Sequence, residues 1–182
     1  DYRLYVYTFP SYLWGFSYPQ SDNDDNKSKY SRTKFEVIAR FLVPLNRYSY
    51  LGPIVRYQYV HAYKLKDNAP QLLAGMPMTV SDVAVGVSYT LDSRDFMLNA
   101  SRGWFMQLDL TANPTFLGNN NTYWSAEMQL ATYRKAWRGA IIAGELHTRQ
   151  STGQVPWPML SDVGSSNRMR GYYEGRYRDK NV

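Results

Sequence analysis

The chain has 182 residues, no cysteine and a formal net charge of +6, and 16% of its residues are aromatic, 17 of them tyrosine. This length fits one domain, and the lack of cysteine excludes disulfide scaffolds, thiol catalysis and cysteine–zinc sites. Its Lys and Arg residues stand singly between apolar ones, without the basic patch or module of a nucleic-acid-binding protein, so nucleic acid is not an expected partner. No stretch of sequence approaches the ~18 apolar residues of a transmembrane helix.

Apolar and polar residues alternate with a period of two, which predicts an all-β chain because successive strand side chains point to opposite faces. Residues 83–91 (VAVGVSYTL) are one example, with a large apolar residue at each odd position. No segment shows the 3.6-residue stripe of an amphipathic helix. In chain order we expect eight strands, at about 2–13, 32–44, 50–65, 80–92, 103–113, 123–135, 139–150 and 170–179.

The connections alternate between long and short. Long polar loops occupy 14–31, 66–79, 114–122 and 151–169, and shorter turns lie at 45–49, 93–102 and 136–138. Up-and-down barrels of the outer membrane have long loops outside and short turns on the periplasmic side. The rhythm therefore predicts an antiparallel transmembrane β-barrel.

The polar faces of these strands carry large charged or amide side chains in mid-strand. Such residues suit a wet lumen or an outer solvent face, so alternation by itself leaves a membrane barrel, a soluble lipocalin-like barrel and a sandwich open. Aromatic residues near the strand ends favour a bilayer with two interfacial girdles. The polar residues are Lys34, Glu36, Arg40, Arg56, Gln58, Gln107, Asp109, Glu127, Gln129, Glu145 and His147, and the aromatic residues are Tyr48, Tyr50, Tyr63, Trp104, Tyr123, Trp124, Tyr133 and Trp137.

The C-terminal stretch GSSNRMRGYYEGRYRDKN (residues 164–181) resembles the signature of the BamA/TamA-type outer-membrane insertase family, the bacterial surface antigen family, in its Bacteroidetes-like versions. In that family a long extracellular loop folds back into the lumen. Its tip has a hydrophobic–Arg–Gly–aromatic tetrad, matched here by Met169, Arg170, Gly171 and Tyr172. The segment GRYRDKN is similar to the strand that leaves this loop.

A second stretch, LDSRDFMLNASRGWFMQLDL (residues 91–110), is similar to the family's periplasmic hairpin, with Asp92, Arg94 and Asp95 before Gly103. From the residues, we expect these Asp side chains to cap backbone N–H groups of a structural turn. Ala100 stands where the family often has Pro, and Gly164-Ser165 where it often has Gly-Gly.

The resemblance implies a sixteen-strand barrel of which this chain holds about eight strands. Residues 1–182 are then one partial barrel domain, with the lumenal loop and exit strand at about 151–182, and the chain, which opens with Asp1 and lacks a signal peptide, is an internal fragment. It also implies assembly or translocation of proteins at the bacterial outer membrane. The implied partners are outer-membrane lipids, client outer-membrane proteins or a passenger domain, and accessory lipoproteins, and no cofactor is expected.

In such a lumen Arg170 needs a carboxylate or water, since an unpaired buried charge is costly; without the surrounding motif, Arg170 would be an ordinary solvated loop arginine. The family implies a partner on a following wall strand. Within the chain Glu174 and Asp179 are the local candidates, and Asp109, Glu127 and Glu145 lie further back.

Catalytic and metal sites are not expected. His61 and His147 are the only histidines, and a metal site needs more ligands nearby. His147 shares a face with Glu145, which leaves open an acid–base pair in an outer-membrane barrel protease or lipase; a soluble ligand-binding barrel is the third alternative. The acidic run of residues 22–25 lacks the glycine and distal glutamate of a calcium loop.

Overall fold

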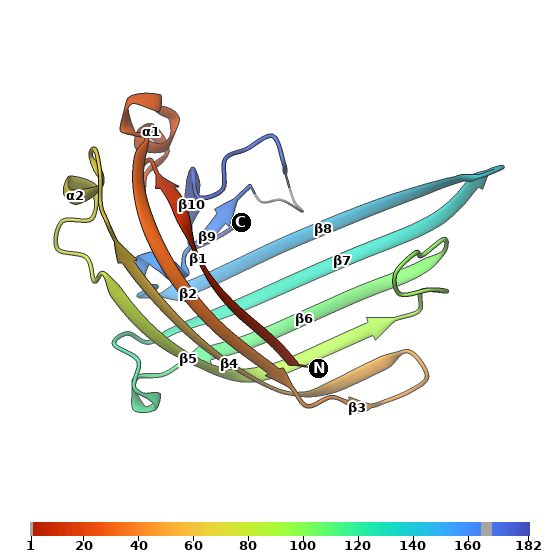
Figure 1. Ribbon diagram of the computed structural model, residues 1–182. Helices are drawn as coiled ribbons and strands as arrows, with labels where there is room; N and C mark the ends of the chain where they lie inside the picture. Colours follow the sequence, from red (N-terminus) through yellow and green to blue (C-terminus); the bar gives the residue numbers. More distant parts are fainter. Residues whose placement is uncertain (1, 165–168) are drawn as a thin grey trace.

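The computed structural model describes residues 2–164 and 169–182, which form one curled antiparallel sheet and a loop segment on its concave side (Figure 1). Neighbouring strands follow the order of the chain, apart from β3, which pairs only β4. The strands are β1 (Tyr2–Leu13), β2 (Ser28–Arg40), β3 (Val43–Pro44), β4 (Ser49–Tyr63), β5 (Thr79–Asp92), β6 (Gly103–Asn113), β7 (Tyr123–Trp137) and β8 (Ala140–Gly153). Residues 165–168, part of the C-terminal motif, lie outside the described residues.

The predicted rhythm of connections is confirmed. Three long connections, with α1 (Tyr18–Asp22), η1 (Asp24–Asn26), α2 (Ala69–Leu72) and η2 (Thr115–Leu117), lie at one end of the sheet, which we call the loop end. The shorter turns at 41–48, 93–102 and 138–139 lie at the other, the turn end. None of the helices within the described ranges has the length and apolar character to cross a membrane.

The two faces of the sheet are the reverse of those in a soluble barrel. Polar side chains are buried on the concave face, whereas large apolar side chains are exposed on the convex face. In β4, for example, Arg56 is buried and its neighbour Val55 is exposed. The buried polar residues of the wall include Arg32, Arg40, Arg56, Gln58, Asp82, Ser88, Asp109, Thr111 and Ser125, and the exposed apolar ones include Leu4, Val6, Val55, Val87, Leu110, Trp124 and Leu146.

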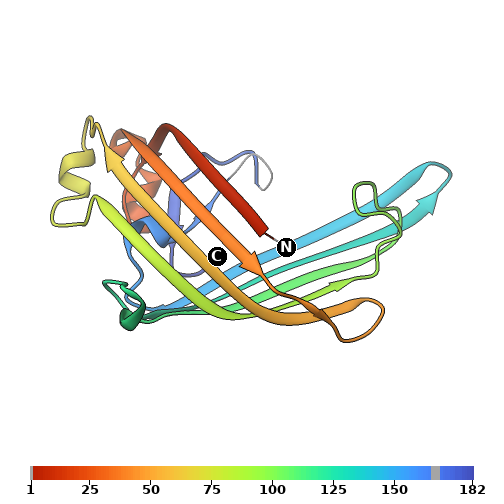
Figure 2. The same cartoon turned by 60° about the horizontal axis from the view of Figure 1, so that its bottom comes forward.

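After β8 the chain turns back onto the concave side through η3 (Trp157–Met159), β9 (Ser161–Val163) and β10 (Tyr177–Asp179), which both views show beside β1 and β2 (Figures 1 and 2). We call residues 154–164 and 169–180 the inward loop. Trp157 lies in a hydrophobic cluster with Leu13, Tyr30, Ala62 and Leu73. Among the described residues, this segment therefore lies on the concave side of the wall, where the lumenal loop was expected.

The expected eighth strand at 170–179 is wrong as a strand of the wall. Residues 170–176 form turns, and only 177–179 are extended, as β10, which pairs β9 in a separate two-stranded sheet. Backbone hydrogen bonds close the turns from Tyr172 N to Met169 O (3.0 Å) and from Arg176 N to Tyr173 O (3.2 Å). The wall therefore has seven long strands and the short β3.

The wall is open at both edges. Within the described residues β1 pairs only β2, and the outer edge of β8 meets only the end of the chain. There Asn181 bridges to Gln150, and Arg149 and Val182 exchange two backbone hydrogen bonds of 2.8 Å. Residues 181–182 thus lie antiparallel to the outer edge of β8.

Candidate functional site: an inward loop on a polar wall

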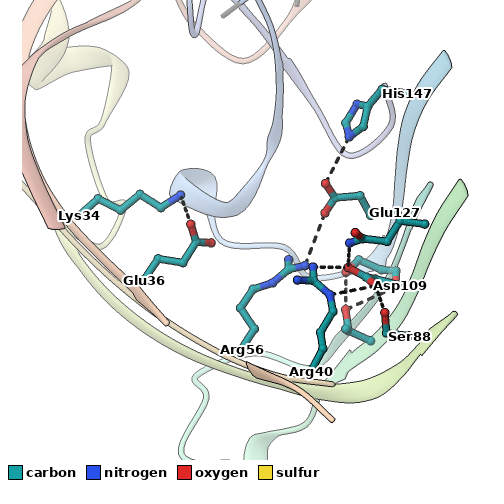
Figure 3. Close-up of polar contacts among 11 residues, drawn as sticks. Lys34, Glu36, Arg40, Arg56, Ser88, Asp109, Glu127 and His147 are labelled. Atoms are coloured by element: carbon teal, nitrogen blue, oxygen red, sulfur yellow. Dashed lines mark hydrogen bonds and ion pairs between the residues drawn. The ribbon is translucent and has the colours of Figure 1, made fainter. Parts of the chain in front are cut away.

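The concave wall carries an ion pair between strands that are not neighbours. Arg40 of β2 donates through Nη2 to Asp109 Oδ2 of β6 at 2.7 Å, although β4 and β5 lie between these strands (Figure 3). Ser88 Oγ and Gln107 Nε2 donate to the same carboxylate at 2.6 and 3.0 Å. Both charged side chains are almost fully buried, so the pair is a fixed part of the wall.

A second set lies nearby on the same face. Glu127 of β7 accepts from Arg56 of β4 at 3.5 Å and lies 3.2 Å from His147 Nε2 of β8 (Figure 3). Glu145 was considered as the acid–base partner of His147, but the carboxylate beside His147 is that of Glu127. Glu145 accepts a hydrogen bond from Gln129 at 3.1 Å. His61 is remote from this set and lies 2.8 Å from Thr79 Oγ1. The described residues hold no group of three His, Asp or Glu side chains suited to a metal.

Trp157 anchors the start of the inward loop. Its indole N–H donates to the Pro77 carbonyl at 2.8 Å, and its ring lies edge-on to Phe16 and Tyr30 at centroid distances of 6.2 and 5.9 Å. Arg178, near the end of the loop, lies over the same ring at 6.0 Å. The tryptophan therefore joins both arms of the loop to the wall.

The end of the loop is held by arginines of the wall and of the loop itself. Arg32 of β2 forms an ion pair with Glu174 at 2.7 Å. Arg178 is buried and donates to Tyr30 Oη and to the Gly175 carbonyl, both at 3.2 Å. Arg176 contacts Asp24 at 3.0 Å and the Ser21 carbonyl at 3.0 Å, so the acidic run in the first long loop binds the inward loop.

An apolar exterior around a polar concavity occupied by a loop is the arrangement of a membrane barrel and excludes the soluble alternatives. A model of the Omp85 superfamily domain matches residues 2–181, almost the whole chain. The chain belongs to the Omp85 superfamily. A search of curated proteins finds no match. Membership of Omp85 supports the resemblance to the BamA/TamA type. The Omp85 superfamily consists of outer-membrane barrels that insert or transport proteins.

In this Omp85 chain the tetrad lies at the tip of the inward loop. Met169 has a left-handed backbone (φ 49°), and Arg170 is exposed. Among the described residues no carboxylate forms an ion pair with Arg170, so Glu174 and Asp179 are not brought to it; Glu174 pairs with Arg32. Asp179 is exposed and accepts from the backbone N–H of Lys180.

In the family tetrad, Gly171 is expected to let the loop turn or approach the wall closely, and Tyr172 to pack against the barrel interior. Gly171 lies in a turn. A Cβ at Gly171 would meet no atom within 4 Å; the close approach is at Gly164, where a Cβ would lie 2.6 Å from the Tyr172 carbonyl oxygen. Tyr172 is half exposed, with its ring edge-on to Tyr177 at 5.9 Å.

At the turn end, the acidic residues hold the hairpin between β5 and β6. Asp92 accepts from Arg94 Nε and Nη2 at 2.9 and 2.7 Å, a bidentate pair. Asp95 accepts from the backbone N–H groups of Phe96, Ser101 and Arg102 and from the Ser101 hydroxyl. These side chains cap the turn, which is a structural role.

Sequence reasoning missed the residues that dock the inward loop: Arg32, Arg176 and Arg178, with Tyr30 as a neutral acceptor. A signal existed, because the spacing of two between Arg176 and Arg178, and between Tyr30 and Arg32, puts each pair on one face of an extended segment. What could not be seen is which segments those faces meet, since Arg178 and Tyr30 are 148 residues apart.

The turn end offers a first test, through Gly103. Its φ is +113°, and a Cβ would lie 2.4 Å from the Ser93 carbonyl oxygen. Gly103→Ala is expected to destabilise the fold by about 1–3 kcal/mol through backbone strain, measured as the denaturant midpoint of the heat-modifiable band. Gly139→Ala is the matched control, because φ is also positive there but a Cβ meets nothing within 4 Å. Equal losses in both variants would contradict a role for the close approach.

Acid should loosen the same hairpin through Asp95. The Ser101 hydroxyl and the backbone N–H groups hold the pKa of the Asp95 carboxyl below its ordinary value. A lowered folded pKa means that the stabilisation is complete above the unfolded value of ~3.9 and is lost as the pH falls through the folded value. We expect hydrogen-exchange protection of the Ser101 and Arg102 amides to persist at pH 5 and to be lost only in stronger acid. In Asp95→Asn it should be reduced at every pH; unchanged protection would refute the cap.

Proposed function

We propose that the chain is a wall segment and lumenal loop of a bacterial outer-membrane barrel that assembles or translocates proteins. On this proposal the loop end faces the cell exterior, the turn end faces the periplasm, and further strands complete the wall, to about sixteen in all. The open edges of β1 and β8 support this, since unpaired strand edges are not tolerated in lipid. The barrel acts as a machine without catalytic residues.

The observation that carries the proposal is the inward loop on the polar wall. Its contacts with Asp24, with Tyr30 and Arg32 of β2, and with Pro77 before β5 come from three separate parts of the chain. A loop held at so many points braces the wall from within. The edges of the first and last strands of the complete barrel are then the surface for clients, which bind by edge pairing. In this proposal the tetrad tip, with Arg170, reaches a carboxylate on a wall strand that follows residue 182.

The direct test is a folding assay. The whole protein that carries this domain is placed in lipid vesicles, and the folding of an unfolded outer-membrane β-barrel client is followed by heat-modifiable migration. We expect faster client folding than in vesicles without the protein, or release of a passenger segment to the outside. A protein that resides in the membrane but changes neither client folding nor passenger exposure would contradict the proposal.

The convex face gives a separate prediction about the membrane. Leu110 lies in the middle of β6 on the apolar face and is 49% exposed. Leu110→Arg should hinder membrane assembly, because an arginine facing the hydrocarbon costs about 2–4 kcal/mol near the midplane. Gln71→Arg, in the exposed part of α2, is the control and should assemble normally. Equal yields of folded, membrane-inserted protein for the two variants would contradict a lipid-facing β6.

A further inference from the structure

A small polar cavity lies between the inward loop and the wall. Its volume is about 120 Å³, whereas a volume on the order of 10–15 Å³ is enough for one water molecule. Wall strands contribute Arg32, Lys34 and Arg149, and the inward loop contributes Asp162, Glu174 and Arg178. The cavity is therefore a junction where four cationic side chains converge from three parts of the chain, β2, β8 and the inward loop.

Within the described residues, two of these cations form no ion pair with a carboxylate. Arg178 is 7% exposed, and its guanidinium donates only to neutral oxygens, those of Tyr30 and Gly175. Arg149 makes backbone hydrogen bonds through its N–H and carbonyl, but its Nε is buried without a partner in the described part of the chain. Arg149 is partly buried, and Glu127, which lies opposite it on β7, forms its ion pair with Arg56. A buried guanidinium without a counter-charge is costly, so Arg178 in particular calls for a negative group.

The other charges at the cavity do not supply it. Glu174 is engaged by Arg32 at 2.7 Å, and Lys34 is engaged by Glu36 of its own strand at 3.1 Å. Arg32 also has a buried Nε without a partner. Asp162 lines the cavity but, among the residues described, forms no ion pair with either arginine. The lining of the cavity thus has four cationic side chains and two carboxylates, and guanidinium groups bind oxyanions through parallel N–H groups.

We propose that this cavity, which we call the arginine chamber, binds a small tetrahedral oxyanion of the phosphate or sulfate class. The anion would be held between Arg149 of the wall and Arg178 of the inward loop. It would thereby link the loop to β8 at a point where cationic side chains outnumber carboxylates. The size of the chamber restricts the ligand to the oxyanion itself or a single headgroup phosphate.

The test measures inorganic phosphate. The whole protein, purified in detergent and shown to be folded by heat-modifiable migration, is dialysed to equilibrium against labelled orthophosphate at fixed chloride concentration. We expect one saturable site per chain, with an affinity at least tenfold lower in Arg149→Gln and in Arg178→Gln. Arg138→Gln removes the same charge from the exposed turn between β7 and β8 and should bind like the wild type. If Arg178→Gln does not fold, Arg149→Gln and Arg178→Lys replace it.

Two results would overturn the proposal: folded wild-type protein with no saturable phosphate site, or equal binding in Arg149→Gln and Arg138→Gln. A carboxylate from elsewhere in the protein that fills the chamber would produce the first of these, with Arg149→Gln destabilised to the same degree at every phosphate concentration. Short-chain phosphatidic acid distinguishes the sources of the anion. Displacement of the bound phosphate identifies a lipid headgroup, and no displacement identifies a free oxyanion.

Discussion

Trp157→Ala is expected to lower the free energy of unfolding by about 3–5 kcal/mol, the range for removing a buried aromatic side chain. Trp157 is 5% exposed and packs on Tyr30 and Leu73, and its indole N–H donates to Pro77 O. The change therefore leaves a cavity and an unpaired acceptor between the inward loop and the wall. We expect the loop to become sensitive to protease while the wall strands stay protected.

The measurement is denaturant unfolding in detergent, with limited proteolysis to locate the change. Trp137→Ala is the matched control, since Trp137 is 72% exposed near the tip of the β7–β8 hairpin. It is expected to change the stability by less than ~1 kcal/mol and to leave the loop resistant to protease. If the two variants unfold at the same denaturant concentration, the loop is not anchored by Trp157.

Asp109→Asn is also expected to lower the free energy of unfolding strongly. The substitution keeps the shape of the side chain but removes the charge that Arg40 Nη2 contacts at 2.7 Å, in a site where both side chains are almost fully buried. Removal of one partner of a buried pair costs about 3–5 kcal/mol, because the other charge remains buried. Asp67→Asn, at an exposed loop position, is the control and should have little effect.

A double variant distinguishes the contribution of the charge pair from that of the other hydrogen bonds at Asp109. Arg40→Met with Asp109→Leu removes both charges, and replacement of a buried pair by apolar residues is often neutral. We expect it to unfold closer to the wild type than Asp109→Asn does. A double variant as unstable as the single one would show that the hydrogen bonds of Ser88 and Gln107, and not the charge pair, hold this part of the wall.

Most of the wall could be predicted from the sequence, because alternation is a local signal. The expected strands at 2–13, 103–113 and 123–135 agree with β1, β6 and β7 to within two residues. The expected strand at 32–44 is different: the ladder of β2 ends at Arg40, and Phe41 N donates to the Pro53 carbonyl at 3.0 Å. Pattern alone does not show such a break, because the apolar alternation continues through it.

The inward loop was harder to predict, because its fold depends on contacts between distant residues. The resemblance of the C-terminal motif implied that the loop turns inward, but it did not indicate the path. Residues 170–176 were expected to begin a strand, yet they form turns closed by hydrogen bonds from Tyr172 N and Arg176 N. Glu174 was expected near Arg170, but it accepts a hydrogen bond from Arg32, which is 142 residues from Glu174 in the sequence.

The ion pairs across the wall also determine how strongly the sheet bends. Arg40 and Asp109 belong to strands three steps apart, and so do Arg56 and Glu127. Along the sheet three steps span about 14 Å at ~4.8 Å each, but the straight line across the concave side is shorter. An arginine and a carboxylate can meet only at a limited range of curvature. The width of the lumen is thus encoded in side-chain reach as well as in the number of strands.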